Sequence, residues 1–129
     1  MKSIQELTTK ELGNWGEGIV AQHFKEIGYS ILARNWHHSR YGEVDVVASR
    51  DGELHIIEVK TRRSVRSGYP IEAVTHKKYE QIRKISNAYL HSDDCADTWY
   101  KSIHIDVIGV LVHGEIYELK ELMKVALYD

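Results

Sequence analysis

Three residues near the middle of the chain have the types and spacing of a metal-dependent hydrolytic site. Asp45 is followed, after a gap of twelve residues, by Glu58, and Lys60 comes two positions later. Mg²⁺ prefers oxygen ligands and keeps several waters, so one or two carboxylates suffice to bind it. A bound divalent cation can polarise a phosphodiester and activate water near neutral pH. The ammonium group of Lys60 could orient that water and offset charge on the phosphate. These residue types therefore indicate phosphodiester hydrolysis.

A predicted β-hairpin positions these residues. Segments 43–49 and 54–61 are rich in β-branched residues and flank an Asp-Gly pair at 51–52, a strong hairpin signal. A two-residue turn there places Asp45 directly opposite Glu58. Side chains alternate between the two faces of a strand, so the register also predicts which residues share a face. We expect Glu43, Asp45, Glu58 and Lys60 on one face and Val44, Val46, Ile57 and Val59 on the other, toward the core.

The pairing of Asp45 with Glu58 needs a physical reason. Directly opposed side chains have Cβ atoms roughly 4.5–5.5 Å apart, and like charges at that separation destabilise a sheet. A divalent cation would turn the repulsion into coordination. The alternative is an ordinary surface hairpin with a salt bridge between Glu43 and Lys60, which would contribute about 0–1 kcal/mol. That alternative leaves the two opposed carboxylates unexplained, so the pattern favours a metal site.

Apolar periodicity predicts helices before and after the hairpin. Gly13, Gly16 and Gly18 lie in the first half of the first helix, which indicates close backbone packing there or a later helix start. The element order α-β-β-β-α-β-β predicts an α/β fold in a single domain over residues 1–129. The expected elements are a helix at 8–27, strands at 29–35, 43–49 and 54–61, a helix at 71–90 opened by Pro70, strands at 100–112 and 115–119, and a short helix after 120, with loops at 36–42 and 62–69.

Charge is distributed unevenly along a chain whose net charge is only −2. Residues 60–84 contain eight basic and two acidic residues, a formal charge of +6, which leaves −8 for the rest. Such a segment can form a basic patch that binds phosphates, although a solvated loop and helix face is the plainer interpretation. The residues expected to contact nucleic acid are Arg62, Arg63, Lys77 and Lys78.

The composition indicates the cellular compartment in which we expect the chain to act. No apolar run approaches the roughly 18 residues that a membrane helix needs, and the first 18 residues have no apolar signal-peptide core. Cys95 is the single cysteine, so an internal disulfide is excluded and a reducing, cytoplasmic location is expected. The eight histidines lack zinc-type spacing. The sequence does not fix the oligomeric state, and a homodimer is compatible with it.

Several motifs together resemble a known family. The signature Asp45…Glu58-Val59-Lys60 is similar to that of restriction-endonuclease-like nucleases, and the likeness extends over about residues 13–110. The whole resembles the small bacterial YraN-type family of predicted endonucleases (UPF0102), which is similar to archaeal Holliday-junction resolvases. The stretches that carry this resemblance are GEGIVAQHFKEIGYSILARN, YGEVDVVA, IIEVKTR, GYPIEAVTHKKYEQI and IDVIGV.

The resemblance implies a restriction-endonuclease-like core, a central mixed β-sheet flanked by helices. It implies that Asp45, Glu58 and Lys60 are catalytic and that Glu17 joins the two acids at the metal, Mg²⁺ or Mn²⁺. It also implies that DNA, branched or structured, is the partner. A non-catalytic nucleic-acid-binding module with the same fold is the alternative. The sequence departs from the family pattern at His104-Ile105 before Asp106, where Arg-Phe is expected, and at His37-His38, where arginine is expected. Lys78 and Gln81 share one face of the second predicted helix and could approach the site.

Overall fold

The computed structural model describes residues 2–65 and 74–128 and shows an α/β fold. A five-stranded mixed sheet has the strand order β1-β2-β3-β4-β5. Neighbouring strands are antiparallel except for β3 and β4, which are parallel. The elements are η1 (Ile4–Glu6), α1 (Thr9–Glu26), β1 (Ser30–His38), β2 (Gly42–Arg50), β3 (Glu53–Arg63), α2 (His76–Leu90), η2 (Asp93–Cys95), β4 (Ser102–His113) and β5 (Ile116–Tyr128).

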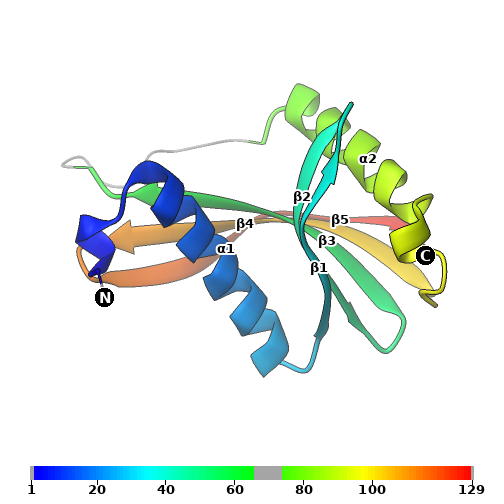
Figure 1. The fold of residues 1–129 in the computed structure, drawn as a ribbon, viewed down its shortest axis with the longest axis horizontal. Helices are drawn as coiled ribbons and strands as arrows, with labels where there is room; N and C mark the ends of the chain where they lie inside the picture. Colours follow the sequence, from blue (N-terminus) through cyan, green and yellow to red (C-terminus); the bar gives the residue numbers. More distant parts are fainter. Residues whose placement is uncertain (1, 66–73, 129) are drawn as a thin grey trace.

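The two helices cover opposite faces of this sheet (Figure 1). Leu12, Val20 and Phe24 of α1 pack in one buried cluster with alternate residues of β2, β3 and β4. Ile85 and Tyr89 of α2 pack with the intervening residues of the same strands. Because both faces of the central strands are covered, these strands are apolar along nearly their whole length. The mixed sheet flanked by helices is the restriction-endonuclease-like arrangement expected from the sequence.

Local signals fix where the helices begin and end. Thr8 and Glu11 form a capping box in which each side chain accepts a hydrogen bond from the backbone N–H of the other. Gly28, with φ of +96°, follows the end of α1 in a conformation that favours glycine. Thr75 caps α2 by accepting a hydrogen bond from the Lys78 N–H at 3.1 Å. Among the described residues, no helix is long and apolar enough to cross a membrane.

One of the three glycines of α1 packs closely against the sheet. A Cβ atom at Gly16 would lie 1.9 Å from the Thr61 hydroxyl, whereas a Cβ at Gly13 would meet nothing within 4 Å. The expected close packing is therefore confirmed at Gly16. It brings the first half of α1 directly against β3, next to the residues of the expected site.

The structure corrects several predicted boundaries. β1 runs to His38 and β2 begins at Gly42, so the loop expected at 36–42 shortens to a turn at 39–41, and β3 runs through Arg63. α2 begins at His76 rather than at 71, while Pro70 and residues 71–73 lie outside the described residues.

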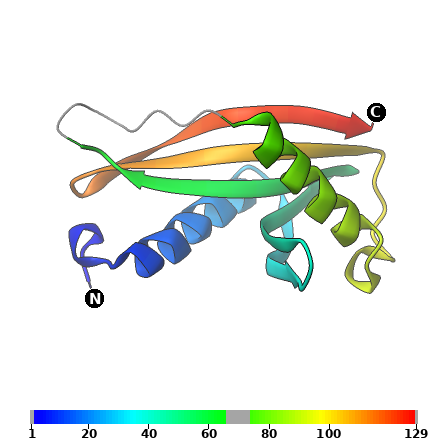
Figure 2. The same ribbon diagram turned by 90° about the horizontal axis from the view of Figure 1, so that it is seen from above.

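The short helix expected after 120 is wrong, because β5 continues to Tyr128 beside β4. The local sequence Glu-Leu-Met-Lys favours a helix, but the backbone groups of the β4 edge need partners, and β5 supplies them. Figure 2, which views the molecule from above, shows β5 following β4 along the sheet.

Candidate functional site

The β2–β3 hairpin has the predicted register as far as its strands stay paired. The ladder runs from Arg50 opposite Glu53 to Val46 opposite Ile57. Beyond that point the Asp45 carboxylate, rather than a backbone carbonyl, accepts the Val59 N–H, at 2.8 Å. The simple register predicted that Asp45 and Glu58 form a ladder pair. The structure shows that they do not. Asp45 instead marks the place where β2 parts from β3.

This parting of the strands also changes which face one core residue occupies. Val46, Ile57 and Val59 pack in the cluster beneath α1, as expected. Val44 packs in the cluster beneath α2 instead. The prediction that all four share one face is therefore wrong for Val44. A local irregularity where pairing stops breaks the strict alternation of side chains.

The carboxylates face an open cavity of about 260 Å³ between β2, β3 and α2. Asp45 and Glu58 lie on its wall together with Glu43. Lys78 and Gln81 of α2 also line it, which confirms that this face of the second helix approaches the site. The cavity is large enough to admit water and a phosphate group beside the carboxylates.

Three acids lie near Asp45, and we call Glu17, Glu43, Asp45 and Glu58 the acidic cluster. Burial raises the pKa of Asp45 to about 7, and the charges of the other three carboxylates act in the same direction, against the opposing hydrogen bond from Val59. Glu17 thus acts on Asp45 from α1, and its carboxylate accepts a 2.5 Å hydrogen bond from the side-chain amide of Asn35. Glu17 and Glu58 thus lie close enough to affect the pKa of Asp45, but no three of the four carboxylates of the acidic cluster lie within 4.8 Å of one another.

Lys78 contacts this cluster directly, whereas Lys60 is related to it only by its position on β3. The Lys78 ammonium is 3.0 Å from the Glu58 carboxylate, an ion pair between half-buried groups. Lys60 follows Glu58 on the same face of β3 by strand alternation. Among the described residues, the half-buried Lys60 side chain makes no hydrogen bond or ion pair, and Lys60 is not one of the residues that line the cavity.

The remaining residues expected to bind nucleic acid divide between two faces. Arg62 shares the face of Lys60, and Lys77 is exposed in the first turn of α2. Arg63 points to the other face, where it donates hydrogen bonds to the carbonyls of Ile4 and Leu7. Arg63 therefore ties the N-terminal segment to the sheet, a structural contact that the sequence did not indicate.

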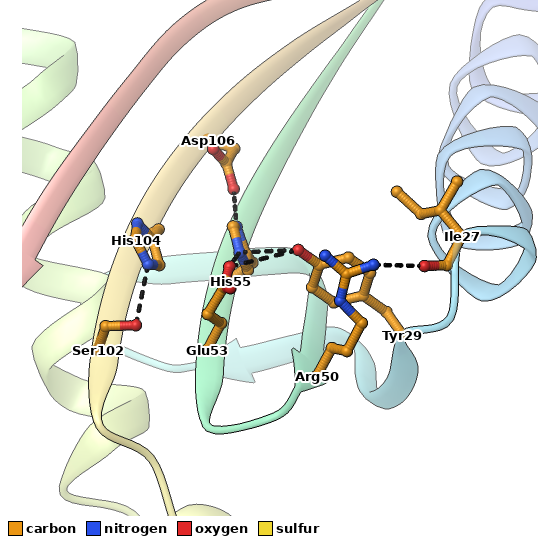
Figure 3. A network of polar contacts seen from close by, with 8 residues as sticks. All are labelled: Ile27, Tyr29, Arg50, Glu53, His55, Ser102, His104 and Asp106. Atoms are coloured by element: carbon orange, nitrogen blue, oxygen red, sulfur yellow. Dashed lines mark hydrogen bonds and ion pairs between the residues drawn. The ribbon is translucent and has the colours of Figure 1, made fainter.

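A second polar cluster, which sequence reasoning missed, lies at the start of β3 and β4 (Figure 3). Glu53, His55 and His104 each offer a ligand atom, and these atoms all lie within 4.8 Å of one another. This His–Glu cluster could hold a metal ion. Histidine spacing could not reveal it because the two histidines are 49 positions apart and meet only through the parallel pairing of β3 with β4. The available signal was a pair of polar residues, His55 and Asp106, within otherwise apolar central strands.

Hydrogen bonds hold the buried His55 ring in a defined orientation. Its Nδ1 lies 2.5 Å from the buried Asp106 carboxylate, and its Nε2 lies 3.2 Å from Glu53 and 3.3 Å from the Tyr29 hydroxyl. Burial lowers the pKa of His55, but the hydrogen bonds and charges of Asp106 and Glu53 outweigh it and raise the pKa overall. Burial and the neighbouring His55 lower the pKa of His104.

The sequence of this chain matches one family model and several proteins of the same family. A family model described as "Uncharacterised protein family UPF0102" matches residues 16–110. A UPF0102 protein of Syntrophomonas wolfei is 45% identical over 103 residues, which cover 80% of this chain and 86% of the relative. A UPF0102 protein of Herpetosiphon aurantiacus is 39% identical over 102 residues, which cover 78% of this chain and 82% of the relative. A UPF0102 protein of Acidothermus cellulolyticus is 44% identical over 112 residues, which cover 81% of this chain and 83% of the relative.

Proposed function

Because this chain belongs to the UPF0102 family, whose description assigns no activity, we propose from its site that it is a metal-dependent endonuclease that hydrolyses DNA phosphodiester bonds. The observation that carries the proposal is the state of Asp45. Asp45 is half-buried near three other acids, and burial, with their charges, raises its pKa to about 7. A fold that keeps so unfavourable a group beside an open cavity gains from it when a cation is bound.

The residues fit a small divalent cation such as Mg²⁺ or Mn²⁺. Asp45 and Glu58 offer carboxylate oxygens on the wall of the cavity, and Glu17 approaches Asp45 closely enough to raise its pKa. Two carboxylates and several waters satisfy Mg²⁺. When bound, the cation would supply Lewis acidity toward a phosphodiester. Its charge would also remove the repulsion that the acidic cluster otherwise suffers.

Lys60 gives this site a group that a simple cation-binding site would not need. Lys60 is a half-buried residue on the strand face of Glu58, two residues along. From there it would orient the attacking water and stabilise negative charge that develops on the phosphate. Asp45 and Glu58 would bind the cation, and Glu17 would complete the anionic side of the site. The three groups Asp45, Glu58 and Lys60 are therefore proposed as catalytic.

The surface around the cavity suits a DNA backbone. Arg62 lies on the face of Lys60, and Lys77 is exposed beside Lys78 on α2. Such side chains bind phosphates without reading base sequence. The choice of branched or structured DNA as the substrate rests on the resemblance to Holliday-junction resolvases.

Single-turnover cleavage of labelled DNA tests the proposed activity. The substrates are linear duplex, single strand, flap and four-way junction, each with excess protein and Mg²⁺ or Mn²⁺. The parent is expected to cut at least one structured substrate. Lys60→Ala should bind metal and DNA nearly as well but cleave about 10²–10³ times more slowly, because a preorganised charge is lost. Lys60→Arg should retain part of the activity, since the positive charge survives.

Lys101→Ala is the matched control, because Lys101 is an exposed lysine outside the site. It should cleave at the parental rate. If the parent and Lys60→Ala cleave every substrate at the same rate with both metals, the nuclease proposal fails. The chain would then be better described as a nucleic-acid-binding module, provided that it binds the same DNA.

A further inference from the structure

We propose that Glu53, His55 and His104 form a second metal site, separate from the acidic cluster, for a borderline transition-metal cation such as Zn²⁺. Their ligand atoms already lie within 4.8 Å of one another. The three residues come from the first positions of two neighbouring parallel strands, where Glu53 lies opposite Ser102 and His55 opposite His104. A cation bound there would cross-link the beginnings of β3 and β4.

The position of this site separates it from the proposed nuclease centre. His55 contacts the rings of Phe24 and Tyr29, so it lies on the α1 face of the sheet. The cavity of the acidic cluster opens on the α2 face, next to Lys78 and Gln81. The two places share no ligand residue, and the His–Glu cluster is absent from the lining of the cavity beside the acidic cluster.

The donor set determines which cation fits. Two imidazole nitrogens and one carboxylate oxygen are ligands that Zn²⁺ takes readily, with a water in the fourth position. Mg²⁺ demands oxygen ligands, so it would favour the acidic cluster instead. The chemical difference between the two ligand sets predicts that one protein binds two different metals.

Asp106 prepares His55 to act as a ligand. The buried Asp106 carboxylate lies 2.5 Å from His55 Nδ1, which holds the proton on that nitrogen and leaves Nε2 for a cation. Metal-binding histidines characteristically donate their other ring N–H to such a carboxylate. This second contact is independent of the distances among the three ligands.

The Nε2 atom of His55 faces the carboxylate of Glu53. That nitrogen lies 3.2 Å from the Glu53 carboxylate, which can only accept hydrogen bonds. A protonated His55 ring would donate its Nε2–H to this carboxylate, and a bound cation would take the place of that proton. The Tyr29 hydroxyl, 3.3 Å from the same nitrogen, can donate to the nitrogen or to the carboxylate but not to both. A cation between nitrogen and oxygen would satisfy both acceptors at once.

Metal binding requires one small rearrangement. The rings of His55 and His104 are stacked, with centroids 4.6 Å apart and an angle of 14° between their planes. A metal lies close to the plane of each imidazole that binds it, so both rings cannot coordinate one ion while they are stacked. His104 is half-exposed, and its Nε2 is 3.1 Å from the Ser102 hydroxyl. We expect its ring to turn toward the ion, while Asp106 keeps His55 in place.

Zn²⁺ titration by calorimetry, together with the visible absorption of bound Co²⁺, tests the second site in the full chain. The titrations are run with excess Mg²⁺ to occupy the acidic cluster. The parent should bind one Zn²⁺ and give the intense absorption of tetrahedral Co²⁺. Glu53→Gln and His104→Gln should each weaken Zn²⁺ binding by at least about tenfold and abolish that absorption. Both positions are partly exposed, so these variants avoid opening the core.

Two controls isolate the site. His91→Gln changes an exposed histidine at the end of α2, and Asp45→Asn removes a ligand of the acidic cluster. Both should bind Zn²⁺ and Co²⁺ as the parent does. Absence of tetrahedral Co²⁺ absorption in the parent overturns the proposal, and so does equal Zn²⁺ affinity in the parent and the two ligand variants. Loss of binding in Asp45→Asn alone would place the ion at the acidic cluster and overturn it as well.

Discussion

The carboxyl group of Asp45 should make stability depend on pH in the direction opposite to most aspartates. Its pKa is raised from the ordinary 3.8 to about 7, chiefly by burial. The folded state therefore holds a proton that the unfolded state has released between about pH 4 and pH 7. Stability of the metal-free protein should fall as pH rises through this window.

Asp45→Asn removes this penalty and keeps an oxygen that can accept the Val59 N–H. We predict that the variant is more stable than the parent at pH 8 by on the order of 2–4 kcal/mol and equally stable near pH 4. Urea unfolding with a chelator present, at several pH values, measures the difference. Asp97→Asn, at an exposed position, is the control and should show no such trend. A parent that is the more stable protein at pH 8 would contradict the prediction.

Lys78 competes with a cation for Glu58. The Lys78 ammonium lies 3.0 Å from the Glu58 carboxylate in the metal-free structure. We predict that Lys78→Gln binds Mn²⁺ up to about fivefold more tightly, which corresponds to the ~1 kcal/mol that such a half-exposed pair contributes at most.

Calorimetric titration of Mn²⁺ measures this change, with Lys77→Gln as the matched control. Lys77 is exposed and adjacent in sequence, so its loss should alter Mn²⁺ affinity much less. Weaker Mn²⁺ binding by Lys78→Gln would instead show that the ammonium helps to organise the metal ligands.

At the scale of elements, the contact between α1 and β3 should make alanine substitutions at two glycines of α1 change stability in opposite directions. A Cβ at Gly16 would overlap the Thr61 hydroxyl, whereas a Cβ at Gly13 would be free of contacts. Gly13→Ala should stabilise the protein by up to about 1 kcal/mol through helix propensity. Gly16→Ala should destabilise it by roughly 1–3 kcal/mol, because α1 must move away from the sheet.

Thermal unfolding of both variants checks this contrast. Adding Thr61→Ala to Gly16→Ala removes the atom in closest conflict and should recover part of the lost stability. If Gly16→Ala is as stable as Gly13→Ala, the close packing of α1 on β3 is not a constraint on the fold.

Elements specified by neighbouring residues were predictable from the sequence, and those specified by distant contacts were not. The Asp-Gly turn fixed the register of β2 and β3 because it is local, and the capping residue Thr8 fixed the start of α1. The helix expected after 120 was wrong because pairing with β4 overrides local propensity. The acidic cluster followed from one hairpin and the family resemblance. The His–Glu cluster required the parallel pairing of β3 with β4, which spacing alone does not specify.

For the molecule as a whole, DNA affinity should depend steeply on salt. The net charge is −2, but residues 60–84 carry a formal charge of +6. Binding through this segment would release counterions from DNA, so affinity should fall as salt rises. Arg62→Glu should weaken binding to all DNA sequences about equally, because phosphate contacts carry no base information.

Fluorescence anisotropy at several salt concentrations measures these effects. Lys25→Glu makes the same charge reversal at an exposed position in the last turn of α1 and should have a smaller effect. Salt-independent affinity, or equal affinity in the parent and Arg62→Glu, would exclude this segment as the binding surface.

The parallel pairing of β3 with β4 has a consequence for the order of events during folding. The β2–β3 hairpin closes through a two-residue turn, so its contacts can form within microseconds. His55 and His104 are 49 positions apart, and their meeting must await closure of a long loop that contains α2. Asp45 and Glu58 should thus come together early, whereas the His–Glu cluster completes only when β4 docks. In refolding experiments, tetrahedral Co²⁺ absorption would report this late docking step, after the hairpin has formed.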